Sequence, residues 1–278
     1  MNPIWGALLA AAIAPRISPG MLAERVDAGL RDYFSLEPQT RTVVQVEAAS
    51  RSMLVGGRAD ALRIRVYDLD LNKVRMPAMA PPGPQGNLRG TVGEATLSFP
   101  NAVVGALRVN DISIRTRGLT FNLGRLLVGG GVSAVSLGTA EVELVIAEWD
   151  LGALLEATVE DLSEVRVEIG EGSRFGVEAR VATPLGGIPV RVTGTLEPFG
   201  RAGVRLANVE VAVLGAALPE ALAQRLVPRF PLEFAPLAGT AFEKAVTLTS
   251  LSTTPGFVHL AGIIDVPALQ AATSTGGR

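Results

Sequence analysis

Apolar and polar residues alternate along much of the chain with a period of two, which is the pattern of strands that bury one face. The pattern recurs in the segments 44–48, 62–71, 107–117, 142–146, 165–169, 177–181, 190–196, 204–213 and 246–251. Such alternation predicts half-buried antiparallel strands. The last segment continues through the turn residues Pro255 and Gly256 to about Ile264, which predicts a hairpin.

Three segments show helical spacing instead. The first follows Ser18 and Pro19 and carries an apolar residue every fourth position, which predicts an amphipathic helix over 22–34. Asp150 is a good N-cap for a second helix over 151–159. A third is predicted over 218–227, because Leu218-Pro219 can open it and Pro228 ends it.

The proportions of these elements predict an α+β, strand-dominated fold. Long strands with one apolar face need to be covered, and three short helices cannot cover a flat sheet of this length. We therefore expect a highly curved antiparallel sheet wrapped around a long amphipathic helix, the one at 22–34. In domain terms, we expect an apolar N-terminal segment at 1–18, a single domain at 19–266 and a flexible tail at 267–278.

Composition narrows the chemistry. Of 278 residues, 48% are hydrophobic and 19% charged, which excludes a disordered chain. The 25 basic and 27 acidic residues leave a net charge of −2, so no nucleic-acid partner is expected. With no cysteine and a single histidine, His259, the chain lacks the means for a disulfide, a thiol nucleophile or a multi-histidine metal site. We expect no cofactor.

The N-terminal apolar run at 4–14 is about half the ~20 residues that a membrane-spanning helix needs. Its length and the exit Ala12-Ile13-Ala14 suit an export signal, but Met1-Asn2-Pro3 carries no basic residue. Two interpretations stay open, an export signal or anchor and a segment that packs on the domain. We expect a location at the cell envelope or membrane periphery, with a cytoplasmic one as the alternative.

Candidate catalytic groups are few. Asp68 and Asp70 stand two apart in an alternating segment and so share its solvent side, where charge is ordinary. Trp149 precedes a helix start, and we expect it to pack in the core, with an interfacial position as the alternative. No nucleophile and base pair or phosphate loop emerges, so we do not expect an enzyme. A hydrolase that uses two carboxylates distant in the sequence is the alternative.

The order of elements resembles a known family. A helix at 23–34, a strand at 42–48, the segment 53–60, the helix start Trp149-Asp150-Leu151-Gly152-Ala153-Leu154-Leu155, the strand 190–196, the helix 218–228 and the final hairpin follow one another. This order resembles the bacterial LmeA-like phospholipid-binding family over about residues 20–266. The resemblance implies a relation to tubular lipid-binding modules, in which a curved antiparallel sheet wraps a helix around an acyl-chain groove. It implies no catalytic residues.

Our functional hypothesis is non-catalytic binding of a phospholipid or another long-chain amphiphile in an aliphatic groove, with peripheral membrane contact. Burial of acyl chain yields about 0.8 kcal/mol per methylene, so binding needs no head-group motif. The alternative is a structural or partner-binding module with a filled core and no ligand. The residues expected to line the groove are Leu22, Val26, Leu30 and Phe34 from the first helix and Leu154, Leu155 and Leu222 from the shorter helices.

Overall fold

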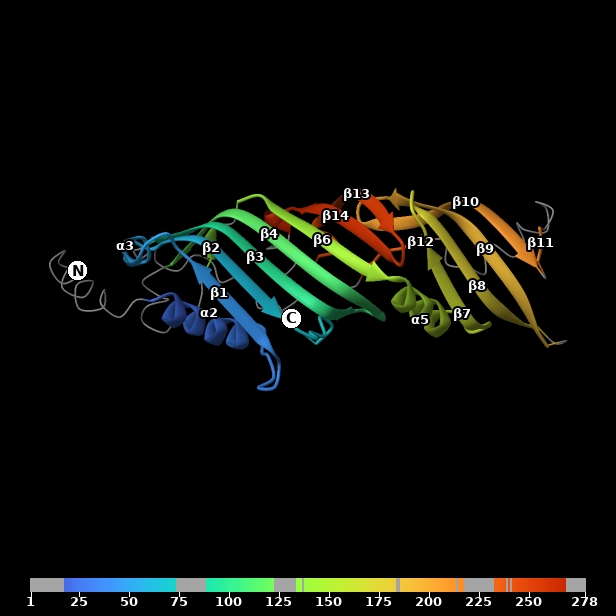
Figure 1. The fold of residues 1–278 in the computed structure, drawn as a ribbon, viewed down its shortest axis with the longest axis horizontal. Coiled ribbons are helices and arrows are strands. Elements are labelled where there is room, and N and C mark those ends of the chain that lie inside the picture. Colours follow the sequence, from blue (N-terminus) through green and yellow to red (C-terminus); the bar gives the residue numbers. More distant parts are fainter. Residues whose placement is uncertain are drawn as a thin grey trace.

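The alternating segments form long strands in the structure, a computed structural model that describes residues 18–73, 89–122, 134–136, 138–183, 186–213, 215–217, 233–238, 240 and 242–268. The strands make two curved sheets that lie end to end along an elongated molecule (Figure 1). The predicted strand-dominated fold with a curled, largely antiparallel sheet is confirmed.

The first sheet is built from both ends of the described chain. Its strand order is β1-β2-β3-β4-β6-β14-β13, and β5 adds to β4. The predicted C-terminal hairpin is confirmed as β13 and β14, and β14 pairs with β6. The strands are β1 (Thr42–Glu47), β2 (Arg58–Val66), β3 (Arg89–Val104), β4 (Leu107–Asn122), β5 (Ala134–Ser136), β6 (Ala140–Ala147), β13 (Val246–Thr254) and β14 (Phe257–Ile264).

The second sheet is formed by the sequence between β6 and β13. Its order is β11-β10-β9-β8-β7, with β12 paired to β10, and every pair is antiparallel. Sequence neighbours from β7 to β11 are therefore also neighbours in space. The strands are β7 (Leu162–Ile169), β8 (Arg174–Thr183), β9 (Gly186–Phe199), β10 (Gly203–Val213), β11 (Ala216–Ala217) and β12 (Glu233–Phe234).

One strand pair differs from the predicted antiparallel arrangement. β2 and β3 run parallel, with Leu62 opposite Ala95. The alternation of apolar residues has a period of two in either direction, so it carries no information on strand direction. Strand β2 also ends at Val66, earlier than the alternation predicts, because Asp68 adopts a left-handed turn conformation with φ of 55°.

The helices are α2 (Pro19–Tyr33), α3 (Arg51–Val55) and α5 (Glu148–Thr158). The helix predicted at 22–34 is confirmed as α2, which begins where the Ser18 hydroxyl accepts a hydrogen bond from the Met21 N–H at 3.1 Å. The helix predicted at 151–159 is confirmed as α5, but the expected N-cap is wrong. The helix begins at Glu148 after Ala147, so Asp150 lies in its first turn. A carboxylate in the first turn favours a helix start in the same way as a capping residue, so the sequence signal does not separate the two positions. The third predicted helix, at 218–227, lies outside the described residues.

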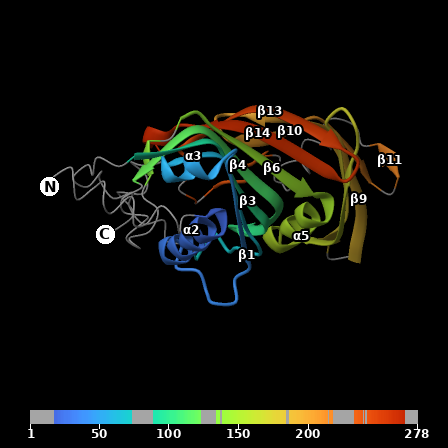
Figure 2. The same cartoon turned by 60° about the vertical axis from the view of Figure 1, so that its left-hand side comes forward.

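The expected long helix wrapped by the sheet is not what the described residues form. At 1.5 Å per residue, the 15 residues of α2 span about 22 Å, and α2 packs mainly on β1 while α5 packs mainly on β7. Figure 2 shows the strands arching over both helices. Two short helices thus pack under the strands, where we expected one long helix. No helix in this part of the chain is long and apolar enough to cross a bilayer.

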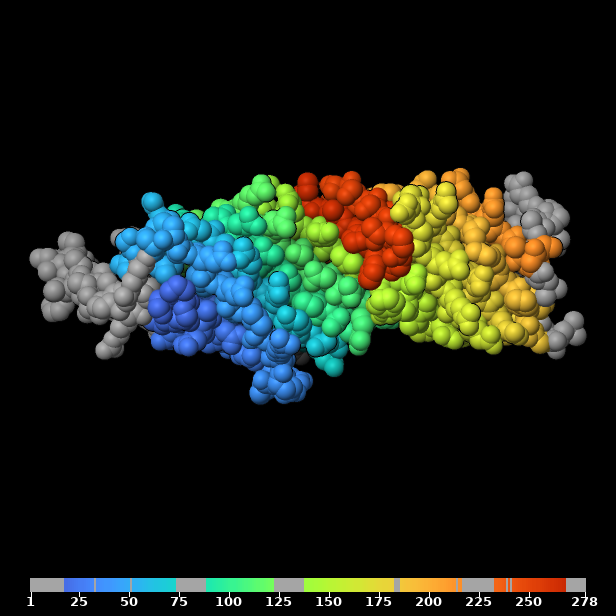
Figure 3. Space-filling model, viewed as in Figure 1, coloured from blue at the N-terminus to red at the C-terminus, as the bar shows by residue number. Residues whose placement is uncertain are grey.

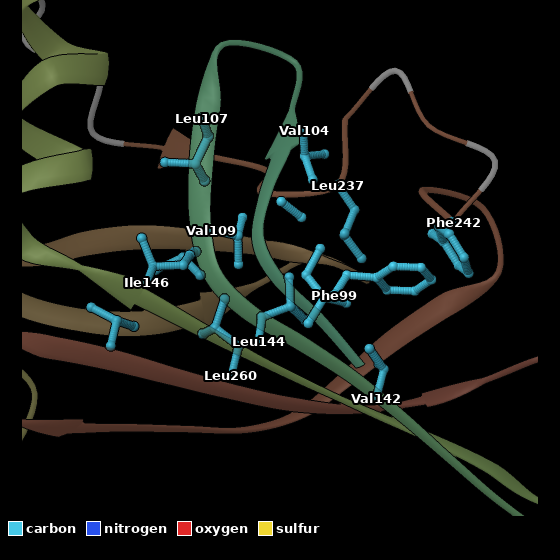
Figure 4. Close-up of a cluster of buried hydrophobic side chains, with 14 of the residues drawn as sticks. Phe99, Val104, Leu107, Val109, Val142, Leu144, Ile146, Leu237, Phe242 and Leu260 are labelled. Carbon is cyan, nitrogen blue, oxygen red and sulfur yellow. The ribbon is translucent and has the colours of Figure 1, made fainter. Parts of the chain in front are cut away.

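The interior of the first sheet is filled by the chain's own side chains. Phe99, Val109, Leu144 and Leu260 come from four strands and are almost completely buried. Two residues between β12 and β13 complete this part of the core (Figure 4). They are Leu237 and Phe242. The same hydrophobic cluster continues into the second sheet, so one apolar interior runs through both.

One place where the two sheets meet is the tip of the β13–β14 hairpin, which lies between the N-terminal part of the molecule and the second sheet (Figure 3). The Gly256 N–H donates to the Ile169 carbonyl at 3.1 Å. The Thr253 hydroxyl accepts from the Ser173 N–H at 2.9 Å and donates to the Gly170 carbonyl. These bonds fix the hairpin to β7 and β8.

Trp149 is the clearest departure from expectation in side-chain placement. It was predicted to pack in the core, but its side chain is 60% exposed. The two residues of α5 that are buried are Leu151 and Gly152. Because each helical residue turns the chain by about 100°, Trp149 lies roughly opposite Leu151 and faces away from the interior.

Candidate functional site

A groove of about 240 Å³ lies between α5 and the second sheet. It exists because α5 packs over β7, at one edge of the sheet, and so leaves the neighbouring strands open to the same side. The groove is lined by Leu151, Leu154, Leu155 and Thr158 of α5, Phe175 and Val177 of β8, Val192 and Leu196 of β9, Leu206 of β10 and Phe234 of β12.

The floor of the groove is a set of cross-strand neighbours. Val177 pairs with Val192 across β8 and β9, and Leu196 pairs with Leu206 across β9 and β10. Directly paired residues point to the same face of a sheet, so these side chains form a continuous apolar surface. Val192 is only 1% exposed, which shows how tightly the base of the floor is packed.

The opposite wall is α5, which lies close to the sheet at Gly152. A Cβ added at Gly152 would lie 3.6 Å from the Val165 carbonyl oxygen and 3.8 Å from a Val167 methyl group. Gly152 is itself buried, so the helix backbone rests almost directly on β7. Leu154 and Leu155 are only half-buried, because they project past the edge of this contact into the groove.

The one polar side chain among the described lining residues is Thr158, at the rim. Its hydroxyl donates to the Leu154 carbonyl within the helix at 2.7 Å, so its one proton is already used. The lining thus presents hydrocarbon to whatever enters. An enclosed apolar cavity of about 150 Å³ already holds a small hydrocarbon ring, and this groove is larger.

The predicted site residues fall in different places. Leu154 and Leu155 line the groove, and that they contact lipid stays a prediction. The four α2 residues do not line it: Leu22 packs with Leu54 in a small separate cluster, Val26 and Phe34 belong to the main core, and Leu30 packs partly against that core. Leu222 lies outside the described residues. That the α2 residues and Leu222 contact lipid stays a prediction.

Most of the floor was missed by sequence reasoning. The missed residues are Phe175, Val177, Val192, Leu196, Leu206 and Phe234. The signal was present for most of them, because alternation placed strands at 177–181, 190–196 and 204–213 and so marked their inward faces. A strand face that is covered by a helix and a strand face that is left open have the same sequence pattern. Only the position of α5 in the structure shows which strands of this sheet are left open.

The titratable groups with shifted pKa values are not among the groove-lining residues. Burial raises the pKa of Asp111, the Glu143 carboxylate adds to the rise, and Arg65 opposes it. Burial also raises the pKa of Asp150, against the influence of Arg108 and of a hydrogen bond from Trp149. Within the described residues, no three histidine, cysteine, aspartate or glutamate side chains gather as a metal site would require.

Comparison with protein families decides what kind of protein carries this groove. The model of the family described as LmeA-like phospholipid-binding matches residues 83–263. The chain belongs to this family. The matched region runs as far as β14 and contains every groove-lining residue, whereas α2 precedes it. The resemblance expected from the sequence is thereby confirmed for the family, over residues 83–263 of the 20–266 expected. No curated protein and no solved structure matched the chain.

Proposed function

We propose that the groove between α5 and the second sheet binds the acyl chain of a phospholipid or a similar long-chain amphiphile, without chemical change to it. The observation that carries the proposal is the hydrocarbon lining of the groove, from Leu151 to Phe234. Membership of a phospholipid-binding family supports a lipid as the ligand. The polar head group stays outside, because the other lining residues described are apolar and Thr158 lies at the exposed rim with its hydroxyl proton already donated within its helix.

The energetics are sufficient without any head-group contact. Removing acyl chain from water yields about 0.8 kcal/mol per methylene, so about eight buried methylenes yield about 6 kcal/mol before ordering costs. That free energy corresponds to a dissociation constant between millimolar and micromolar. Any added contact of the head group with the rim would tighten binding further.

The two-carboxylate hydrolase alternative finds less support at this site. Asp111 and Glu143 are close enough to influence each other. They lie on β4 and β6 of the first sheet, whereas the groove is formed by α5 and the second sheet. The residues that would meet an acyl chain are therefore suited to holding it.

The proposal is tested by filling the groove. Leu155→Trp places an indole where the chain would lie, whereas Ala153→Trp adds the same group on the exposed side of the same helix. We expect native mass spectrometry to detect one long-chain fatty acid bound per wild-type protein. Leu155→Trp should weaken this binding by about tenfold or more, since loss of only two buried methylenes costs about that much, and Ala153→Trp should not.

Thermal unfolding of both tryptophan variants shows whether a loss of binding comes from a loss of folding. Equal melting temperatures with unequal fatty-acid binding support the groove. The proposal is wrong if the wild-type protein binds no fatty acid, or if Leu155→Trp binds it as well as Ala153→Trp does.

A further inference from the structure

An exposed aromatic pair marks the start of the groove helix. Trp149, in the first turn of α5, meets Phe257, the first residue of β14, edge to face with ring centroids 5.8 Å apart. Trp149 is 60% exposed and Phe257 is half-buried. Tryptophan is highly buried on average in folded proteins, so an exposure of this size needs a reason.

The geometry that fixes Trp149 is a contact between rings. Its ring packs edge to face against Phe257, and more than half of its surface stays exposed. The hairpin that carries Phe257 is fixed in turn, because the Glu148 N–H donates to the Gly256 carbonyl at 3.0 Å.

We propose that Trp149 and Phe257 anchor this protein at the surface of a lipid bilayer. Aromatic rings that combine an apolar body with a polar edge favour the zone between head groups and acyl chains. The inference goes beyond acyl-chain binding but rests on it in one respect, since a lipid for the groove must come from a bilayer. Leu151, two residues after Trp149, lines the groove, so the anchor and the binding site share one helix.

The size of the pair favours a bilayer over a protein partner. Two aromatic side chains offer at most about 300–500 Å², whereas a stable protein complex buries about 800 Å² on each partner. The other large exposed apolar residues described do not extend the patch. Ile263 lies six residues further along β14, about 20 Å away, and the ring of Phe199 is covered by the Arg205 guanidinium at 5.5 Å.

The charges near the pair indicate which bilayer it suits. Glu148 and Asp150 flank Trp149 in the sequence, so two acidic residues stand beside the exposed ring. Anionic lipids are attracted by basic residues, and acidic residues at this position do not favour them. We therefore expect binding to neutral, zwitterionic bilayers that does not increase when anionic lipid is added.

The chain offers a direct test, because Trp149 and Trp5 are its two tryptophans. In full-length protein carrying Trp5→Phe, the fluorescence reports on Trp149 alone. With phosphatidylcholine vesicles we expect a blue shift of the emission, and with brominated phosphatidylcholine we expect quenching. Trp149→Ala should abolish co-sedimentation with the vesicles and Phe257→Ala should reduce it. Phe199→Ala, at the covered ring, should leave it unchanged.

The outcomes separate this inference from the acyl-chain groove. Trp149 faces away from the groove, so Trp149→Ala should still bind a soluble fatty acid like the wild type. The anchor is wrong if the single-tryptophan protein shows neither shift nor quenching with vesicles, or if Trp149→Ala co-sediments normally. Should Trp149→Ala fail to fold, the quenching result still decides. A wild-type protein that binds no fatty acid would instead contradict the proposal that the groove binds acyl chains.

Discussion

The side chain of Leu206 on β10 occupies the space where a side chain at Gly194 on β9 would stand. A Cβ added at Gly194 would lie 3.0 Å from the Leu206 Cγ and Cδ1 atoms and 2.6 Å from the Ala207 carbonyl oxygen. Gly194 lies between Val192 and Leu196, both of which line the groove. The shape of the groove floor thus depends on one residue that has no side chain.

Gly194→Ala should therefore destabilise the protein. The new methyl group meets a backbone oxygen, which cannot move as the end of a side chain can, so we expect a loss of about 1–3 kcal/mol. Thermal unfolding measures it. The matched control is Gly152→Ala, whose Cβ would make ordinary contacts at 3.6 Å and which gains up to about 1 kcal/mol of helix propensity. Similar melting temperatures for the two variants would contradict this account of the floor.

The hydrocarbon lining predicts that affinity depends on the length of the acyl chain and not on the head group. Lysophospholipids with one chain and different head groups should bind with dissociation constants within about threefold of each other, which is less than 1 kcal/mol. Adding two methylenes should strengthen binding by up to about tenfold, until the groove is full. Calorimetry below the micelle concentration measures both series. A strong dependence on head group at fixed chain length would show that the rim contributes contacts of its own.

The Thr253 hydroxyl should be worth more than an average threonine hydroxyl, because it bonds to both Ser173 and Gly170 across the junction of the sheets. Thr253→Val keeps the shape but leaves a half-buried N–H and a carbonyl without this partner, so we expect a loss of about 1–3 kcal/mol in urea unfolding. Thr249→Val on the same strand is the control, because that exposed hydroxyl donates only to Ala261. Equal losses would contradict a special role for Thr253.

Asp111 should make stability depend on pH. Burial raises its pKa in the folded protein above the ordinary value, so the folded state binds its proton more tightly than the unfolded state does. The protein therefore loses stability as the pH rises from the ordinary aspartate pKa through the raised one. Asp111→Asn removes the charge and should raise the melting temperature at pH 7 by about 1–2 °C.

The gain from Asp111→Asn should shrink as the pH is lowered toward the ordinary aspartate value, where the wild-type carboxyl also becomes neutral. Asp32→Asn, at an exposed position of α2, is the control, and its effect should stay small across the range. A stabilisation by Asp111→Asn that is the same at every pH would show that its cause is not the charge.

The helices and strands could be predicted from the sequence because each produces a repeat of apolar residues over a few neighbouring positions. The stripe that begins at Leu22 predicted α2, and the turn at Pro255-Gly256 predicted the final hairpin. Residues such as Val192 and Leu196 were assigned to strands for the same reason. Each of these features depends on neighbours within a few positions.

The features that the sequence did not reveal depend on distant contacts. The parallel pairing of β2 and β3, the division into two sheets and the open side of the groove are set by how elements dock. Trp149 shows the limit most clearly. A tryptophan beside a helix start is compatible with the core or the surface, and its exposure is decided by the way α5 lies on β7.

The pairing of Phe257 with Ala147 sets the order in which the molecule can assemble. The whole second sheet lies between these two residues in the sequence, yet it is made mostly of consecutive hairpins and can fold from local contacts as it emerges from the ribosome. Strand β6 can pair with β4 at once, but its other edge stays open until β14 has been made. If the second sheet has formed by then, it shortens the effective loop between them, which lowers the entropic cost of closure. The topology thus allows the groove to form before the first sheet is complete.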